Sequence, residues 1–326
     1  MSETEAATPD VTATMRAVGR AVEAPDFVLP WLDRFYDEDD AELILAAAGT
    51  AKGPAMRAGD AAGALAGFDP ARLSRAVRRA VLDVDEAGAF APADFHERLE
   101  IWAMFEGWKD VPLAVHRQVA AWEIDHYAEK IRADVEATCD GHPGDSYEAR
   151  YGYVLLHEAE AIVAAQDHIY LWPCDCRSIV GKCRKPRDVC LRFTNDRGLG
   201  WEISKERAVD ILRTTDKAGL MHTADVQDDA ADTSSICNCC VDCCYPHLAA
   251  ERLEVSDAWP VRRYIAAFDV DACKACGRCG LRCPFEAIVC GTGGKPAFTG
   301  SLCRGCGLCA TGCSSDAIDL APLTAG

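Results

Sequence analysis

Two stretches near the C-terminus decide the fold of that segment: residues 273–283 read CKACGRCGLRC, and residues 303–313 read CRGCGLCATGC. Both have the spacing C-x2-C-x2-C-x3-C, and the second begins 30 positions after the first. An acidic-Ala-Ile triplet follows each of them, EAI at 286–288 and DAI at 316–318. The chain therefore contains an internal repeat built on cysteines.

This spacing is typical of cubane iron–sulfur sites. Three cysteines spaced two apart can wrap one face of a cluster, and the fourth thiolate comes from elsewhere; in two-cluster proteins the last cysteine of each run binds the other cluster. One [4Fe-4S] cluster is therefore expected on Cys273, Cys276, Cys279 and Cys313. The other is expected on Cys303, Cys306, Cys309 and Cys283. Zinc is the alternative, but it favours paired C-x2-C units separated by a longer gap.

A second block holds nine of the 19 cysteines. Its first part has the spacing C-x-C-x6-C-x6-C among basic residues, which favour thiolates, and comprises Cys174, Cys176, Cys183 and Cys190. Its second part, ICNCCVDCC at 236–244, contains Cys237, Cys239, Cys240, Cys243 and Cys244. Cys240 and Cys243 form a chelating C-x2-C pair, whereas Cys237 and Cys239 repeat the C-x-C spacing of the first part.

Three interpretations of this block remain open. We favour one or two additional iron–sulfur clusters over zinc and over a thiol–disulfide centre, since the C-x2-C pair lacks the βαβ context of a thioredoxin motif. His222 and His247 could add a ligand, although each alone is expected to be an ordinary hydrogen-bonded histidine. Cys139 and Cys290 are expected to be unligated.

Composition excludes several classes of function. The net charge of −18 argues against general nucleic-acid affinity and against docking on anionic membranes. The acidic N-terminus resembles no signal peptide, and no apolar run is long enough for a membrane span, so we expect a soluble cytoplasmic protein. GTGGKP at 291–296 lacks the spacing of a dinucleotide fingerprint.

Local patterns predict an α+β protein. Residues 1–25 are expected to be a mobile leader, and residues 26–140 a helical, winged-helix-like domain. A cysteine-rich α/β domain at 141–260 and a two-cluster domain at 261–326 follow. Helices are predicted at 38–48, 70–83, 93–108, 112–136, 149–165 and 204–218, and a loop with a short helix at 49–63. A turn or short hairpin is predicted at 87–95, a short buried strand that ends at Pro173 within 168–176, and a further strand at 264–273.

The C-terminal segment resembles one known family, and most of the chain resembles a larger, multi-domain family. Residues 264–320 resemble bacterial-type 2[4Fe-4S] ferredoxins, with Ser314 in place of the usual proline after the fourth cysteine. Roughly residues 30–320 resemble multi-domain 4Fe-4S dicluster ferredoxin-type proteins. The matching stretches are FHERLEIWAMFEGWKDVP (95–112), PCDCR (173–177), CRKPRDVCLRF (183–193), ISKERAVDILRTTDKAGLMH (203–222) and ICNCCVDCC. The resemblance implies electron transfer without implying a substrate.

Three functions are consistent with these observations. The first is an iron–sulfur electron carrier or redox-enzyme subunit that meets a partner protein through a basic surface of that partner. The second is a reductase whose middle cysteines bind substrate and are supplied with electrons by the C-terminal clusters. The third is a redox-sensing transcription regulator, in which Arg72, Arg75, Arg78 and Arg79 would contact phosphates.

Overall fold

A computed structural model describes residues 9–50, 65 and 67–323 of the chain. The chain divides into two compact units, residues 1–123 with 196–199 and residues 124–195 with 200–326. The first boundary lies inside a long helix, earlier than the sequence suggests, and the second unit contains both cysteine-rich segments. The fold is mixed α+β, as predicted.

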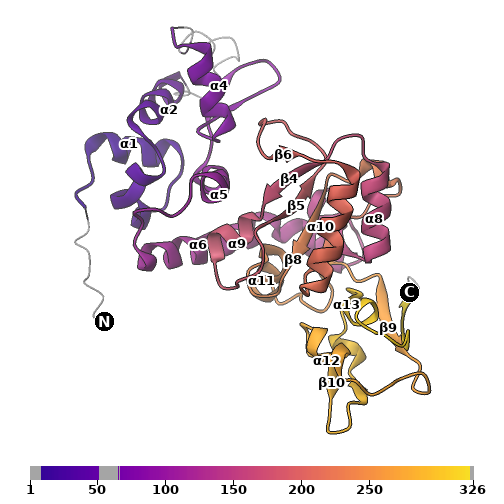
Figure 1. Cartoon of the computed structure of the whole chain (residues 1–326). Helices are drawn as coiled ribbons and strands as arrows, with labels where there is room; N and C mark the ends of the chain where they lie inside the picture. Colours follow the sequence, from indigo (N-terminus) through magenta and orange to yellow (C-terminus); the bar gives the residue numbers. More distant parts are fainter. Residues whose placement is uncertain (1–8, 51–64, 66, 324–326) are drawn as a thin grey trace. The chain divides into compact units, whose positions relative to one another are not determined.

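Helices make up most of the first unit, and several of them begin at a capping side chain. Asp69 accepts a hydrogen bond from the Ala71 amide at the start of one helix, and Asp94 accepts one from the Glu97 amide at the start of another. The elements, labelled where there is room in Figure 1, are α1 (Ala13–Ala21), η1 (Asp26–Arg34), α2 (Glu38–Thr50), α4 (Pro70–Arg78), the antiparallel pair β1 (Leu82–Val84) and β2 (Phe90–Pro92), α5 (Phe95–Phe105) and the first part of α6 (Leu113–Cys139).

A hairpin is present, but its strands span 82–92, so its first strand falls inside the helix predicted at 70–83, which ends at Arg78. The predicted mobile leader is wrong for residues 9–25. Helix α1 is capped by the Thr12 side chain, and Val18 and Val22 are fully buried. The amide of Phe95 donates to the carbonyl of Val22, which ties this segment to α5. Residues 1–8 of the leader and most of the predicted 49–63 loop lie outside the described residues.

A six-stranded antiparallel sheet organises the second unit. Its strand order is β3-β7-β8-β5-β4-β6, and Figure 1 shows α8 and α10 against it. The elements are α7 (Tyr147–Arg150), β3 (Tyr151–Val154), α8 (Leu156–Ala165), β4 (Tyr170–Pro173), α9 (Asp175–Val180), β5 (Asp188–Arg192), β6 (Trp201–Glu202), α10 (Lys205–Lys217), β7 (Met221–Asp225), η2 (Ala230–Asp232), β8 (Ser235–Cys239) and α11 (Tyr245–Arg252).

The prediction of one helix over 149–165 is wrong, because strand β3 separates α7 from α8. All four residues of β3 are buried, and the strand pairs with β7 from Tyr151↔Asp225 to Val154↔His222. The prediction for 204–218 is confirmed: Ser204 caps α10, and Gly219 follows its end with a left-handed φ of 76°.

The structure of the C-terminal segment repeats in the same way as its sequence, with two strand pairs and two short helices. β9 (Tyr264–Phe268) pairs with β12 (Ile318–Pro322), and β10 (Ile288–Cys290) pairs with β11 (Pro296–Phe298). The short helices α12 (Arg278–Arg282) and α13 (Leu308–Thr311) follow Gly277 and Gly307, which have φ values of 73° and 80°. The two triplets place the buried residues Ala287 and Ala317 at equivalent positions.

Candidate metal centres

Four predicted ligands of one cluster line a single enclosed cavity in the C-terminal segment. These are Cys283, Cys303, Cys306 and Cys309, and Phe285 and Leu308 complete much of the apolar wall. Backbone amides of Leu308 and Ala310 donate to the sulfur atoms of Cys306 and Cys309. Burial raises the pKa of Cys309 to about 12, with the neighbouring Cys303 and Cys283 as further causes.

The spacing of these sulfur atoms fits a cluster better than a single ion. Thiolates that share one zinc ion are about 3.8 Å apart, because each Zn–S bond of a tetrahedral site is about 2.3 Å. No three of the four described thiols have sulfur atoms within 4.8 Å of one another. Thiolates around a cubane bind different iron atoms and are held further apart, so this spacing is compatible with a [4Fe-4S] cluster and argues against one ion shared by three of these thiols.

The ligands predicted for the other cluster are the first three cysteines of the first run and the last cysteine of the second run. Cys276 is exposed, Cys273 accepts from the Ala275 amide at 3.5 Å, and Cys313 accepts from the Ala317 amide at 3.4 Å. Among these described residues, no three sulfur atoms of the set lie within 4.8 Å of one another. The sulfur of Cys279 lies 3.8 Å from that of Cys290, which the sequence predicts to be unligated.

The nine cysteines of the middle block separate into a group of six and a group of three. The six comprise Cys174, Cys176, Cys190, Cys237, Cys239 and Cys244, and we call them the six-thiol ring. The three are Cys183, Cys240 and Cys243, which we call the three-thiol site. Sequence spacing did not reveal this division.

The sheet explains how the six-thiol ring is assembled. Cys237 and Cys239 alternate with Asn238 on β8, so both side chains emerge from one face of the sheet. Cys190 lies on β5, which is the neighbour of β8, and Cys174 follows the end of β4, which is the next strand. The remaining two members border helices: Cys244 precedes α11, and Cys176 lies in α9.

Each thiol of the six-thiol ring interacts with two others. The order around the ring is Cys174, Cys176, Cys244, Cys239, Cys237, Cys190 and back to Cys174. The sulfur atoms of Cys244 and Cys239 are 3.3 Å apart. The pKa of Cys174 and that of Cys239 lie well below the ordinary value, because each accepts hydrogen bonds from its two ring neighbours.

Polar protein groups surround the six-thiol ring, and two of them are backbone amides that donate to it. Thr223 and Tyr151 place their hydroxyl groups 3.3 and 3.4 Å from the sulfur of Cys239. The amide of Tyr245 donates to Cys176 at 3.3 Å, and that of Arg177 to Cys174 at 3.5 Å. Such donors stabilise anionic sulfur, so the ring is suited to hold thiolates around a metal centre.

Arg177 supplies a buried positive charge to both groups of thiols. Its side chain is near Cys174, Cys190 and Cys239 of the six-thiol ring, and it hydrogen-bonds to Cys240 of the three-thiol site. The guanidinium also donates to the backbone carbonyls of Pro186 and Asn238. The residue is only 4% exposed, so this charge is held in place rather than solvated.

The two candidate histidine ligands have different surroundings. His222 donates from Nδ1 to Oδ1 of Asn238 at 2.7 Å, and Asn238 alternates with the ring cysteines and therefore faces away from them. His247 lies near Tyr153, with 3.4 Å between Nδ1 and the hydroxyl oxygen. Burial lowers the pKa of both histidines. Each has the character of a neutral, buried side chain.

One apolar cluster connects the six-thiol ring with the four-cysteine cavity. Its buried members include Tyr153, Met221 and Leu308. Cys237, Cys239 and Cys244 of the ring and Cys306 of the cavity belong to the same cluster. Burial raises the pKa of Tyr153, and the next contributions come from Cys306 and Cys244. A single tyrosine thus lies near a thiol of each site.

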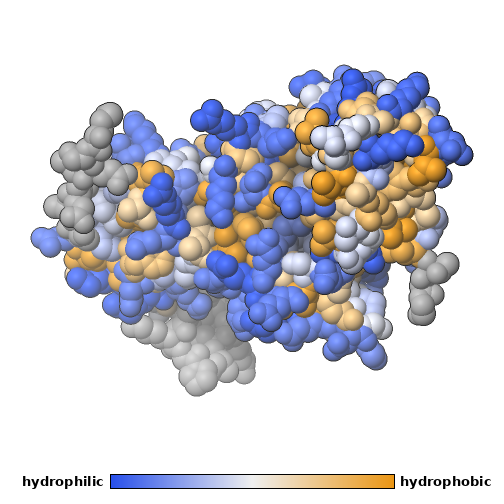
Figure 2. All heavy atoms as spheres, turned by 90° about the horizontal axis from the view of Figure 1, so that it is seen from below, coloured by the Kyte–Doolittle hydropathy of each residue, from blue (hydrophilic) through white to orange (hydrophobic). Residues whose placement is uncertain are grey.

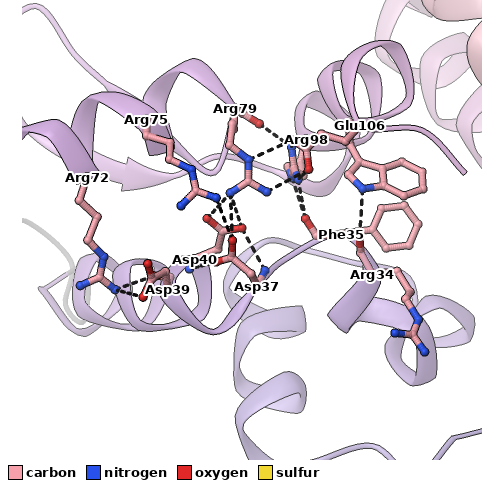
Figure 3. Close-up of polar contacts among 11 residues, drawn as sticks. Arg34, Phe35, Asp37, Asp39, Asp40, Arg72, Arg75, Arg79, Arg98 and Glu106 are labelled. Atoms are coloured by element: carbon pink, nitrogen blue, oxygen red, sulfur yellow. Dashed lines mark hydrogen bonds and ion pairs between the residues drawn. The ribbon is translucent and has the colours of Figure 1, made fainter. Parts of the chain in front are cut away.

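The arginines proposed for phosphate contact are largely paired within the first unit, as Figure 3 shows. Arg72 pairs with Asp39 at 3.3 Å, Arg75 with Asp37 at 3.0 Å, and Arg79 with Asp40 at 2.6 Å. Arg72 also pairs with Glu42 at 2.6 Å. The pKa of Glu106 is lowered to about 2; burial opposes this shift, but hydrogen bonds from Arg98 and Arg79 outweigh it. This pairing offsets the charge of Arg72, Arg75 and Arg79, whereas Arg78, the fourth predicted contact, is exposed.

A histidine–carboxylate group in the first unit escaped sequence reasoning. The group contains His96 and Glu100 of α5 and Glu123 of α6, with ligand atoms within 4.8 Å of one another. His96 Nδ1 lies 2.7 Å from Glu123 Oε1, and both side chains are buried. The i,i+4 spacing of His96 and Glu100 on one helix was the available signal.

The surface is mainly polar. Figure 2 shows one face on which hydrophilic side chains surround smaller apolar patches. Exposed apolar side chains of the C-terminal segment include Val270, Leu281 and Val289. Within the part of the chain that the structure describes, no helix has the length and apolarity needed to span a bilayer.

Known proteins provide no further guide to these centres. No protein-family model, curated protein or solved structure matches this chain.

Proposed function

We propose that this protein is an iron–sulfur electron-transfer protein or the electron-transfer subunit of a redox enzyme. Two [4Fe-4S] clusters would be bound by residues 261–326, and the six-thiol ring would hold a third iron–sulfur cluster. The observation that carries the proposal is the apolar cluster in which Tyr153 and Met221 join ring thiols to Cys306. Packed side chains that contact both sites would provide a path for electron transfer between them.

The C-terminal segment has features expected of a two-cluster ferredoxin domain. Its repeat is reproduced by two strand pairs and by left-handed glycines ahead of α12 and α13. A [4Fe-4S] cluster, when bound, supplies one-electron redox chemistry at a potential set by charge, hydrogen bonds to sulfur and solvent exposure. The amides of Leu308 and Ala310 would contribute to that setting.

The remaining residues have supporting roles in this proposal. Tyr153, Met221 and Leu308 exclude water between the two sites, because all three are almost fully buried. Thr223, Tyr151 and Arg177 would stabilise the negative charge of the six-thiol ring. The winged-helix-like first unit, with its hairpin after α4, would serve protein contacts rather than DNA contacts.

The net charge of −18 favours a redox partner with a basic docking surface. Opposite charge mainly accelerates encounter and is screened by salt. The exposed apolar side chains Val270, Leu281 and Val289 would add contact area near the C-terminal clusters.

Magnetic interaction between neighbouring clusters tests the proposal. The reduced wild-type protein is expected to give a low-temperature EPR spectrum broadened by coupling between paramagnetic centres. Replacing Cys174 and Cys239 together by alanine should remove the ring signal and narrow the remaining one. Cys139→Ala is the matched control, because Cys139 belongs to an apolar cluster apart from both sites. Identical spectra for the wild type and the double variant would count against a ring cluster.

A further inference from the structure

The three-thiol site has a geometry unlike that of the other cysteine groups. The sulfur atoms of Cys183, Cys240 and Cys243 all lie within 4.8 Å of one another, and those of Cys183 and Cys240 are 3.7 Å apart. In a tetrahedral zinc–thiolate site, two sulfur atoms lie about 3.8 Å apart, because each Zn–S bond is about 2.3 Å long. The three sulfur atoms are therefore close enough to bind one ion.

Backbone amides are arranged to support thiolates at this site. The amide of Lys185 donates to the sulfur of Cys183, that of Cys183 to the sulfur of Cys243, and that of Cys243 to the sulfur of Cys240. Arg177 lies against Cys240 and offsets part of the negative charge. Every sulfur of the site thus accepts one amide hydrogen bond, as expected for metal-bound thiolates.

The site is buried on one side and open on another. Leu220 and Val180 pack against it, and Cys240 and Cys243 are 5% and 0% exposed. Within the described residues, no fourth His, Cys, Asp or Glu joins the group within 4.8 Å. Structural zinc sites have four protein ligands, whereas catalytic zinc sites have three and keep one position for water or substrate.

A cavity of about 320 Å³ lies beside Cys240. Basic residues outnumber acidic ones in its wall: Lys185, Lys217 and Arg282 contribute positive charge, and Asp242 contributes negative charge. Arg282 is paired with Asp216 at 3.0 Å, which leaves the two lysines as the main source of excess charge. Lys185 and Lys217 therefore give the wall of this cavity a net positive charge.

We propose that Cys183, Cys240 and Cys243 bind one zinc ion whose fourth coordination position takes a small anion through a sulfur or oxygen donor. The zinc ion would act as a Lewis acid on the bound anion, and Lys185 and Lys217 would attract the negative charge of that anion. Leu281, Arg282 and Pro284 line the same cavity and flank Cys283 of the four-cysteine cavity, so the anion would be held close to a redox centre.

Metal analysis tests the ion independently of the electron-transfer proposal. Full-length protein purified anaerobically should contain about one zinc ion per chain in addition to iron. Cys183→Ala should lose the zinc and keep its iron, whereas Cys139→Ala should keep both. Zinc that persists in Cys183→Ala would overturn the proposal, as would a wild type that lacks zinc.

X-ray absorption at the zinc edge tests the open position without a variant. The wild type should show three sulfur ligands at about 2.3 Å and one lighter ligand. Adding mercaptoacetate should convert this to four sulfur ligands at a lower concentration than neutral mercaptoethanol requires. Lys217→Gln should weaken mercaptoacetate binding about two- to fivefold, as expected for one exposed charge, and Lys130→Gln should not. Four sulfur ligands before any addition, or equal binding of the two thiols, would contradict the proposal.

Discussion

Replacing Cys303 and Cys309 together by alanine is expected to remove about four iron atoms per chain, the content of one whole cubane. Both cysteines are buried and line the cavity that also contains Cys283 and Cys306. Two thiolates cannot hold a cluster that needs four, and alanine offers no substitute ligand. Iron and acid-labile sulfide measured on anaerobically purified protein would give the loss directly.

Which metal the double variant loses distinguishes an iron–sulfur cluster in the four-cysteine cavity from a zinc ion. The double variant should keep the iron of the six-thiol ring, because none of its six thiols lies in the C-terminal segment. Cys139→Ala should keep the wild-type iron content. If the double variant instead lost about one zinc ion and no iron, the cavity would be a zinc site.

Replacing Arg177 by methionine is expected to cause the largest loss of stability of any single change considered. Removing one partner from a buried charged network costs about 3–5 kcal/mol. Here the carbonyls of Pro186 and Asn238 would lose a donor, and the thiols around Cys174 and Cys240 would lose their cation. The thermal midpoint should fall by roughly 10 °C, since 1 kcal/mol corresponds to about 2–4 °C at this domain size.

Two further variants define the cause of that loss. Arg177→Lys should fall between wild type and Arg177→Met, because lysine keeps the charge and loses the planar arrangement of donors. Arg207→Met on the exposed side of α10 should leave the midpoint within about 1–2 °C of wild type, as is usual for surface substitutions. An Arg177→Met protein that melts with the wild type would show that the buried guanidinium does not hold the middle segment together.

Elements with local signals could be predicted from the sequence. Helix α10 begins at its Ser204 cap and ends before Gly219, and the strand that precedes Cys174 ends at Pro173 as expected. Strand β3 could not be found in this way, because its partner β7 lies about seventy residues later and only that pairing buries Tyr151 and Tyr153. Helix α1 was likewise missed, since burial of Val18 and Val22 depends on contacts with the rest of the unit.

The candidate sites show the same limit. The cysteines that line the four-cysteine cavity could be grouped from spacing, because the repeat is local and its pattern is specific. The nine middle cysteines could not be divided, because the division depends on the order β8-β5-β4 and on the alternation of side chains along β8. Cys183, although closer in sequence to Cys190, lies beside Cys240 because it belongs to the loop between α9 and β5.

The iron and acid-labile sulfide content of anaerobically purified wild-type protein is the most direct test of the central claim. Two C-terminal clusters and one cubane in the six-thiol ring predict about twelve iron and twelve sulfide per chain. The Cys174→Ala/Cys239→Ala variant should contain about eight of each. A wild type with about eight or fewer of each, unchanged in that variant, would contradict a ring cluster, and a wild type without iron would contradict the account as a whole.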